Sequence, residues 1–146
     1  MKVVVDANVC VSAVLSGKGN PARILDHALR DGPYDFELCA PPQLFSKLQE
    51  VLVRPKIAGR LGLDSGEIEV YARRLRLAVE EVSLGDDAHI PHYTSDPEDD
   101  PYVHAAVLTR AAYLVSGDED ILSMKDPPVP LVSPAQFVRL WESNLL

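Results

Sequence analysis

The stretch "KVVVDANV" (residues 2–9) joins an apolar segment to a helical pattern through one aspartate. Three consecutive valines predict a strand over residues 2–6 that is buried on both faces, as strands inside parallel sheets are. The pattern that follows predicts a helix from Ala7 to about Leu15. Open α/β sheets bind their ligands beyond the carboxyl ends of parallel strands. We therefore expect the carboxylate of Asp6 to lie at a binding site.

The composition is typical of a soluble globular protein. The 146 residues are 47% hydrophobic and 25% charged, and we expect them to fold as a single domain. The sequence has no apolar run of about 18 residues and begins without a charged-then-apolar leader. We therefore predict a cytoplasmic protein that does not bind a membrane. Cys10 and Cys39 lie in apolar stretches and are predicted to be buried free thiols.

The net charge of −8 limits how the protein would bind nucleic acid. A protein of this charge does not attract nucleic acid by its overall field, which argues against a module that binds by bulk attraction. Metal ions held by acidic side chains can reverse the sign of the charge locally. The composition therefore remains compatible with a metal-dependent enzyme that acts on nucleic acid.

Predicted strands and helices alternate along the chain, which indicates an α/β fold with a mostly parallel central sheet. We predict strands over residues 2–6, 36–40, 79–82 and 129–133, and a strand, a turn and a short helix over 112–122. We predict helices over residues 7–15, 20–31, 41–55, 56–61, 66–78, 101–110 and 134–144, with a loop over 83–98. Among their first residues, Asn20, Asp100, Ser133 and either Asp64 or Ser65 are predicted N-caps.

Acidic residues follow two apolar strands and precede one helix. Asp6 and Asp118 each follow an apolar strand, and the segment "DPEDD" (96–100) leads into the helix that starts near Pro101. An isolated aspartate at such a position is usually a cap or a turn residue. Parallel neighbouring strands would bring these carboxylates into one crevice, where they repel one another unless a cation lies between them. Hard oxygen ligands suit Mg²⁺ or Mn²⁺, and such a site performs metal-assisted hydrolysis.

Three segments carry a resemblance to a known family: "VVVDANVCVSAVLS" (3–16), "LFSKLQEVLVRPK" (44–56) and "DPEDDPYVHAAVLTRAAYLVSGDEDIL" (96–122). The chain resembles the PIN-domain family of metal-dependent nucleases, and within it the toxins of toxin–antitoxin pairs. The resemblance implies a three-layer fold in which helices flank a mostly parallel sheet. It also implies an endoribonuclease that uses Mg²⁺ or Mn²⁺, with RNA as substrate, an antitoxin protein as partner, and a homodimeric state.

The same resemblance implies the residues of the site. Asp6, Asp99 and Asp118 match the catalytic, metal-binding acids of the family, and Asp96 is a further metal ligand in this branch. Ser116 matches the small hydroxyl residue that supports them. If the match between this sequence and the family motif shifts by one residue, Asp100 takes the place of Asp99.

The middle segment departs from the family pattern, because Lys47 stands where the family usually carries a glutamate. Either Glu50, one turn later, reaches the same pocket as a supporting acid, or Lys47 contributes an ammonium in its place. The alternative function is a catalytically inactive PIN-fold module that binds RNA or protein. A small-molecule phosphatase fits less well, because Asn8 stands where such enzymes carry a second acid.

Seven of the 14 basic residues fall between positions 47 and 76. Arg54 and Lys56 are the predicted nucleic-acid contacts of this region, which would follow a phosphate backbone beside the acidic pocket. In the alternative interpretation, "ARRLR" (72–76) is a solvated helix face paired with nearby glutamates.

Overall fold

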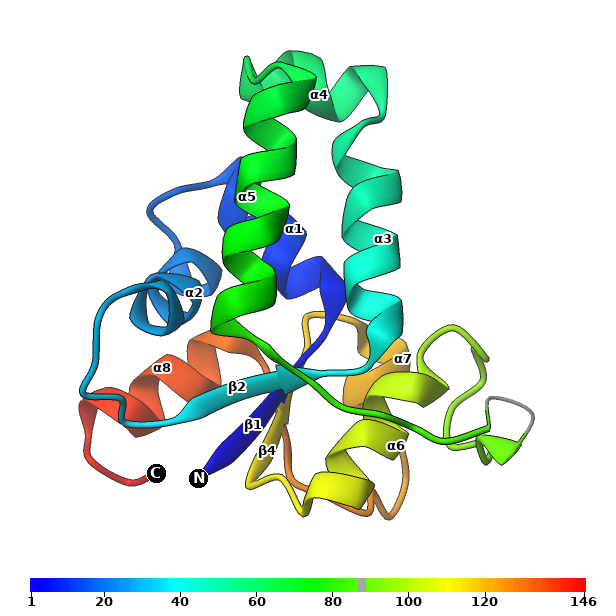
Figure 1. Ribbon diagram of the computed structural model, residues 1–146. Helices are drawn as coiled ribbons and strands as arrows, with labels where there is room; N and C mark the ends of the chain where they lie inside the picture. The colour runs from blue at the N-terminus through cyan, green and yellow to red at the C-terminus, as the bar shows by residue number, and fades with distance from the viewer. Residues whose placement is uncertain (87–88) are drawn as a thin grey trace.

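The computed structural model describes residues 1–86 and 89–146, and Figure 1 shows a central parallel sheet with helices packed around it. The sheet has five parallel strands in the order β3-β2-β1-β4-β5. Their bounds are Lys2–Val5 for β1, Glu37–Ala40 for β2, Glu80–Glu81 for β3, Tyr113–Val115 for β4 and Leu131–Val132 for β5. The predicted α/β fold with a mostly parallel sheet is confirmed. Of the predicted loop over 83–98, residues 87 and 88 lie outside the described residues.

The central strand explains why the valine run ends on an aspartate. Val3, Val4 and Val5 are fully buried in β1, which pairs with β2 on one side and β4 on the other. Asp6 then begins the turn into α1, and its amide N–H donates to the carbonyl of Val115 at the end of β4 (3.1 Å). The ends of β1 and β4 therefore lie side by side.

The helices are α1 (Ala7–Leu15), α2 (Asn20–Leu29), α3 (Pro42–Leu52), α4 (Pro55–Leu61), α5 (Ser65–Ala78), α6 (Asp100–Thr109), α7 (Glu119–Leu122) and α8 (Pro134–Glu142). Helix α6 packs against β1, β2 and β4, whereas α1 packs against α2 and α3, and α2 packs against α8. Within the described residues, no helix is both long enough and apolar enough to cross a membrane.

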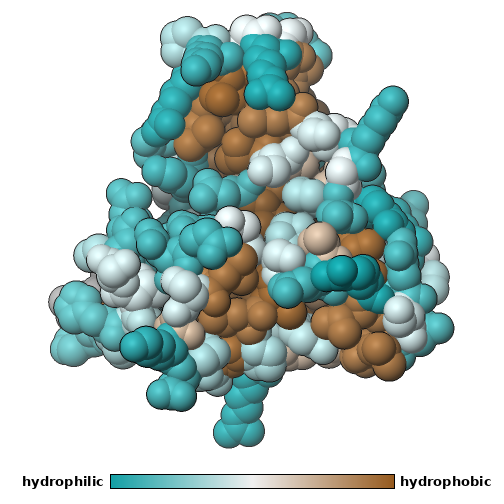
Figure 2. Space-filling model, turned by 180° about the vertical axis from the view of Figure 1, so that it is seen from behind, coloured by the Kyte–Doolittle hydropathy of each residue, from teal (hydrophilic) through white to brown (hydrophobic). Residues whose placement is uncertain are grey.

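Helices α3, α4 and α5 form an arm that rises from the sheet, with α4 at its outer end (Figure 1). None of the residues of α4 is buried, but Ile57, Ala58 and Leu61 are partly covered against the core. Seen from behind, the upper part of the molecule has apolar surface flanked by hydrophilic side chains (Figure 2). The arm therefore exposes both its charged and part of its apolar side chains.

Several predicted helix ends differ from the structure. The N-cap of α2 is Gly19 rather than Asn20, and the helix ends at Leu29 because Arg30 adopts extended backbone before Gly32 and Pro33. Asp99, not Asp100, occupies the N-cap position of α6. The final helix α8 ends at Glu142, two residues early. The predicted capping residues of α5 and α8 are confirmed, since Asp64 pairs reciprocally with Glu67, and Ser133 with Gln136.

Candidate metal centre

A cavity of about 540 Å³ opens at the carboxyl end of β1 and β4. The first turn of α1, the inner side of α3, the loop before α6 and the turn after β4 line this cavity. Its lining includes all four predicted metal-binding acids, Asp6, Asp96, Asp99 and Asp118. The fold thus brings together carboxylates that lie up to 112 positions apart in the sequence.

Asp6 is buried and held by two hydrogen bonds. Its Oδ1 accepts from the backbone N–H of Asn8 (3.2 Å), and its Oδ2 accepts from the hydroxyl of Ser116 (2.8 Å). Burial raises the pKa of the Asp6 carboxyl, which these hydrogen bonds partly offset, and the negative charge of Asp118 raises it further. The hydrogen bonds therefore orient the carboxylate but do not fully offset the cost of burying its negative charge.

Ser116 links the two acids that follow the central strands. Besides donating to Asp6, its fully buried hydroxyl oxygen accepts from the backbone N–H of Asp118 (2.9 Å). Asp118 is the N-cap of α7, and its Oδ1 accepts from the N–H of Asp120 (2.9 Å). One hydroxyl group thus ties the end of β1 to the turn after β4.

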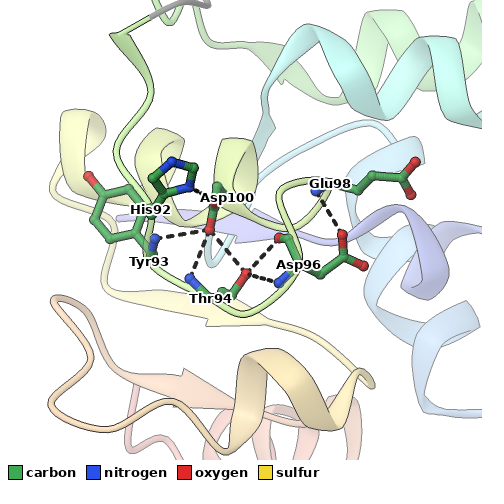
Figure 3. A network of polar contacts seen from close by, with 6 residues as sticks. All are labelled: His92, Tyr93, Thr94, Asp96, Glu98 and Asp100. Carbon is green, nitrogen blue, oxygen red and sulfur yellow. Dashed lines mark hydrogen bonds and ion pairs between the residues drawn. The ribbon is translucent and has the colours of Figure 1, made fainter.

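The loop before α6 is held by a buried carboxylate that does not line the cavity. Figure 3 shows Oδ1 of Asp100 accepting from the N–H groups of Tyr93 (3.0 Å) and Thr94 (2.8 Å) and from the hydroxyl of Thr94 (3.0 Å). The single proton of the Thr94 hydroxyl is shared with the carbonyl of Asp96 (2.7 Å), and Oδ1 of Asp96 accepts from the N–H of Glu98 (3.0 Å). These contacts shape the segment that carries Asp96 and Asp99.

Asp99 faces the cavity and makes no side-chain cap bond to α6. Its Oδ2 is buried and has no hydrogen-bond partner among the described residues. Burial raises the pKa of the Asp99 carboxyl to about 7, with further contributions from the charges of Asp118, Asp96, Asp6 and Asp120. Because Asp100 is occupied by Tyr93 and Thr94, the acid that faces the cavity is Asp99.

One group of three carboxylates includes an acid that the sequence prediction missed. One oxygen each of Asp96, Asp99 and Asp120 lies within 4.8 Å of the others. Asp120 stands in the first turn of α7, two residues after Asp118. The segment "GDED" places two aspartates at the start of one helix, and this spacing is the sequence signal that could have identified Asp120.

The donor set fits a divalent cation. Carboxylate oxygens are the ligands that Mg²⁺ and Mn²⁺ prefer, and the repulsion among these acids is relieved by a positive charge between them. The unpartnered, buried Oδ2 of Asp99 is the atom that most needs such a partner, because a buried acceptor without one is costly. The residues present therefore suit the predicted ion.

Helix α3 contributes both a glutamate and a lysine to the cavity lining. Glu50 lines the cavity, but its Oε1 also pairs with the guanidinium of Arg54, which lies just beyond the end of α3 (2.7 Å). Lys47 lines the cavity too, and its Nζ lies 3.9 Å from Oε2 of Glu98. The predicted nucleic-acid contacts Arg54 and Lys56 lie on the arm and are absent from this described lining.

Comparisons with known proteins agree with this architecture. The sequence profile of the PIN domain family matches residues 2–120. An uncharacterized protein of Methanocaldococcus jannaschii is 22% identical over 126 residues, which cover 86% of this chain and 76% of that protein.

Two solved structures are similar in fold. The crystal structure of VapBC2 from Rickettsia felis bound to a DNA fragment from their promoter matches with a TM-score of 0.61 and 13% identity, covering 91% of this chain and 98% of the other. The crystal structure of DNA-bound VapBC from Salmonella typhimurium matches with a TM-score of 0.57 and 14% identity, covering 92% and 98%. At these identities the likeness establishes the fold.

Proposed function

The chain belongs to the PIN domain family, and on this basis we propose that it is a divalent-metal-dependent endoribonuclease, the toxin of a toxin–antitoxin pair. One observation supports catalysis above the others. Four acids from β1, β4 and the loop before α6 converge on one cavity, where a buried oxygen of Asp99 has no partner in the described part of the chain. Such a cluster is costly to maintain unless a cation joins it.

Asp6, Asp96, Asp99 and Asp118 would hold Mg²⁺ or Mn²⁺, with Asp120 as an added ligand. When bound, the ion supplies Lewis-acid activation of water and neutralises charge on the phosphate. Ser116 keeps the Asp6 carboxylate oriented through its hydroxyl. Asp99 loses its proton as the pH rises through about 7 and then offers both oxygens to the site.

RNA is the proposed substrate because of the family and because basic residues follow the helix that lines the cavity. Arg54 and Lys56 lie just beyond the end of α3, the helix that lines the cavity. Exposed basic side chains in this position would contact the phosphates of an RNA strand and set its register without reading its sequence. The protein has a net charge of −8, but an ion held by the acids would make the charge locally more positive at the point where the RNA strand is cut.

The toxin assignment is supported by the likeness in fold to the two VapBC structures. It implies an antitoxin protein as partner, and the family implies a homodimer. Expression of the chain in a bacterial host should arrest growth, and co-expression of its cognate antitoxin should relieve the arrest. An Asp6→Asn variant that arrests growth equally would contradict the assignment.

Calorimetric titration with Mn²⁺, followed by an RNA cleavage screen, tests the nuclease proposal. Wild-type protein should bind Mn²⁺ and cleave RNA, and Asp6→Asn should lose both properties. Asp31→Asn is the matched control, because Asp31 is exposed and lies outside the cavity lining. If the Asp6→Asn variant retained metal-dependent cleavage, the proposal would be wrong.

An inactive binding module is the second candidate, and Lys47 in place of the usual glutamate is the observation that favours it. The two candidates differ in metal binding by the wild-type protein. If Mn²⁺ binds only to a Lys47→Glu variant, the fold is that of a nuclease whose metal site has been lost. The search would then turn to RNA or protein ligands.

A further inference from the structure

We infer that Lys47 supplies the cationic contact for a phosphate group of the RNA substrate in the acidic cavity. This inference rests on the proposed function and gives the departure from the family glutamate a role. The site would then combine an acid cluster that holds the cation with a lysine that binds the substrate directly.

The charges around the cavity show what a phosphate meets there. Six carboxylates line it, and Lys47 is the one basic side chain among the lining residues that the structure describes; the six are Asp6, Glu50, Asp96, Glu98, Asp99 and Asp118. A phosphodiester group carries a negative charge, so this lining repels it. A bound divalent ion compensates the acids that coordinate it, whereas the substrate still needs a positive group at the mouth of the cavity.

Lys47 is placed to provide that group. It projects from α3, whose neighbouring residues Leu44 and Leu48 are buried in the core and fix the rotation of the helix. Its ammonium reaches toward the loop before α6, where it lies 3.9 Å from Oε2 of Glu98. The backbone N–H of Glu98 donates to Oδ1 of Asp96, so the ammonium stands beside the segment that carries the cavity acids.

The partner of Lys47 is a weak one. The Glu98 side chain is 80% exposed, and at 3.9 Å the pair is a loose surface contact that contributes little to stability. An ammonium has three donors, and one long contact leaves most of them to water. A phosphate oxygen can therefore replace Glu98 at little cost.

Lys47 does not take the place of the metal ion. Its recorded ion pair is with Glu98, whereas the buried Oδ2 of Asp99 has no hydrogen-bond partner within the described residues. The lysine thus leaves the acid cluster uncompensated and available to a cation. Glu50, by contrast, is bound to Arg54 at 2.7 Å and is already compensated.

Binding of RNA, measured apart from cleavage, tests the role of Lys47. The probe is a fluorescent 2′-O-methyl RNA oligonucleotide, and its anisotropy is followed in Ca²⁺ between about 50 and 200 mM salt. Lys47→Met should lower the affinity about three- to tenfold and reduce the salt slope by about one, whereas Lys47→Arg should retain both. Lys18→Met, at an exposed lysine before α2, makes the same charge change and should have little effect.

Mn²⁺ calorimetry on the same variants separates this inference from the proposed function. Lys47→Met should bind Mn²⁺ at least as tightly as wild type, because a positive charge near the acids has been removed. Unchanged RNA affinity and salt slope in Lys47→Met, with Mn²⁺ binding intact, would overturn the role of Lys47 alone. Absence of Mn²⁺ binding in wild type would overturn the proposed function instead. Lys47→Gln serves as a second neutral variant if Lys47→Met does not fold.

Discussion

At the scale of single residues, the candidate centre depends on a few polar side chains with defined partners. Ser116 is fully buried, yet its hydroxyl is satisfied on both sides, by Asp6 and by the N–H of Asp118. Asp99 is the opposite case, because one of its buried oxygens has no partner among the described residues. Satisfied groups hold the geometry, and the unpartnered oxygen of Asp99, on a residue that lines the cavity, is left to accept a ligand.

His27 is a buried polar residue outside the described cavity lining. Its Nε2 accepts from the backbone N–H of Asp35 (3.0 Å), and its ring stacks on Phe36 and meets the edge of Trp141. Burial lowers the pKa of His27, as does the charge of Arg30, while that of Asp35 opposes the shift. A proton on Nε2 would break the bond to Asp35, so the fold holds the neutral ring.

We predict that His27 makes the protein less stable in mild acid. The pKa of His27 is lower in the folded protein than its unfolded value of 6.5, so the unfolded chain takes up the proton first as the pH falls. The stabilising contribution is present above pH 6.5 and declines below it. In urea unfolding at several pH values, His27→Gln should show a shallower loss below pH 6.5 than wild type, and the exposed His89→Gln should not. Equal slopes for His27→Gln and wild type would contradict this.

At the scale of elements, the loop before α6 decides which acids face the cavity. Asp100 binds the backbone of Tyr93 and Thr94, and this turns its neighbour Asp99 toward the site. The sequence "DPEDD" (96–100) contains four acids within five positions. Side-chain type alone therefore cannot say which carboxylate is structural and which faces a ligand.

We predict that Asp100→Ala weakens Mn²⁺ binding by about tenfold, because residues that orient metal ligands typically contribute on that order. Asp100→Asn should retain most of the affinity, since its amide oxygen can still accept from Tyr93 and Thr94. Calorimetry measures the affinities, and thermal unfolding checks that both variants fold. If Asp100→Ala binds Mn²⁺ like wild type, the loop does not depend on this carboxylate.

At the scale of the whole molecule, the acid cluster lowers the stability of the metal-free protein. The pKa of Asp99 rises from 3.8 to about 7 on folding, so the folded state favours the protonated form. Stability from this group is present at low pH and is lost as the pH rises through about 7. At pH 8 the protein therefore carries a buried carboxylate charge that neighbouring acids repel, and a bound cation relieves both the burial cost and this repulsion.

We predict that Asp99→Asn stabilises the metal-free protein at pH 8 by about 1–2 kcal/mol, because it removes this repulsion. Mn²⁺ at about 100 times its Kd should stabilise wild type by about 2.7 kcal/mol and raise its Tm by about 5–10 °C. The variant should lose most of that metal-dependent rise. Calorimetric scans with and without Mn²⁺ measure both effects, and an equal rise in both proteins would contradict the prediction.

The elements were largely predictable because their signals are local. Three consecutive valines become the fully buried strand β1, and Asp64 and Ser133, two of the predicted N-caps, cap α5 and α8. The predictions that failed concern helix boundaries, including the N-caps predicted at Asn20 and Asp100. Neighbouring residues of similar capping ability compete there, and the winner is chosen by contacts outside the helix.

The sequence by itself determined the parallel α/β fold, because hydrophobic periodicity is a local property. Its motifs also resembled the PIN domain family, and that resemblance implied the four acids that line the cavity. Only the tertiary structure decided the rest. It brought Asp120 within 4.8 Å of Asp96 and Asp99, left Oδ2 of Asp99 without a described partner, and set Lys47 beside Glu98. These facts depend on distances between α3, α7 and the loop before α6, and such distances arise only when the elements pack.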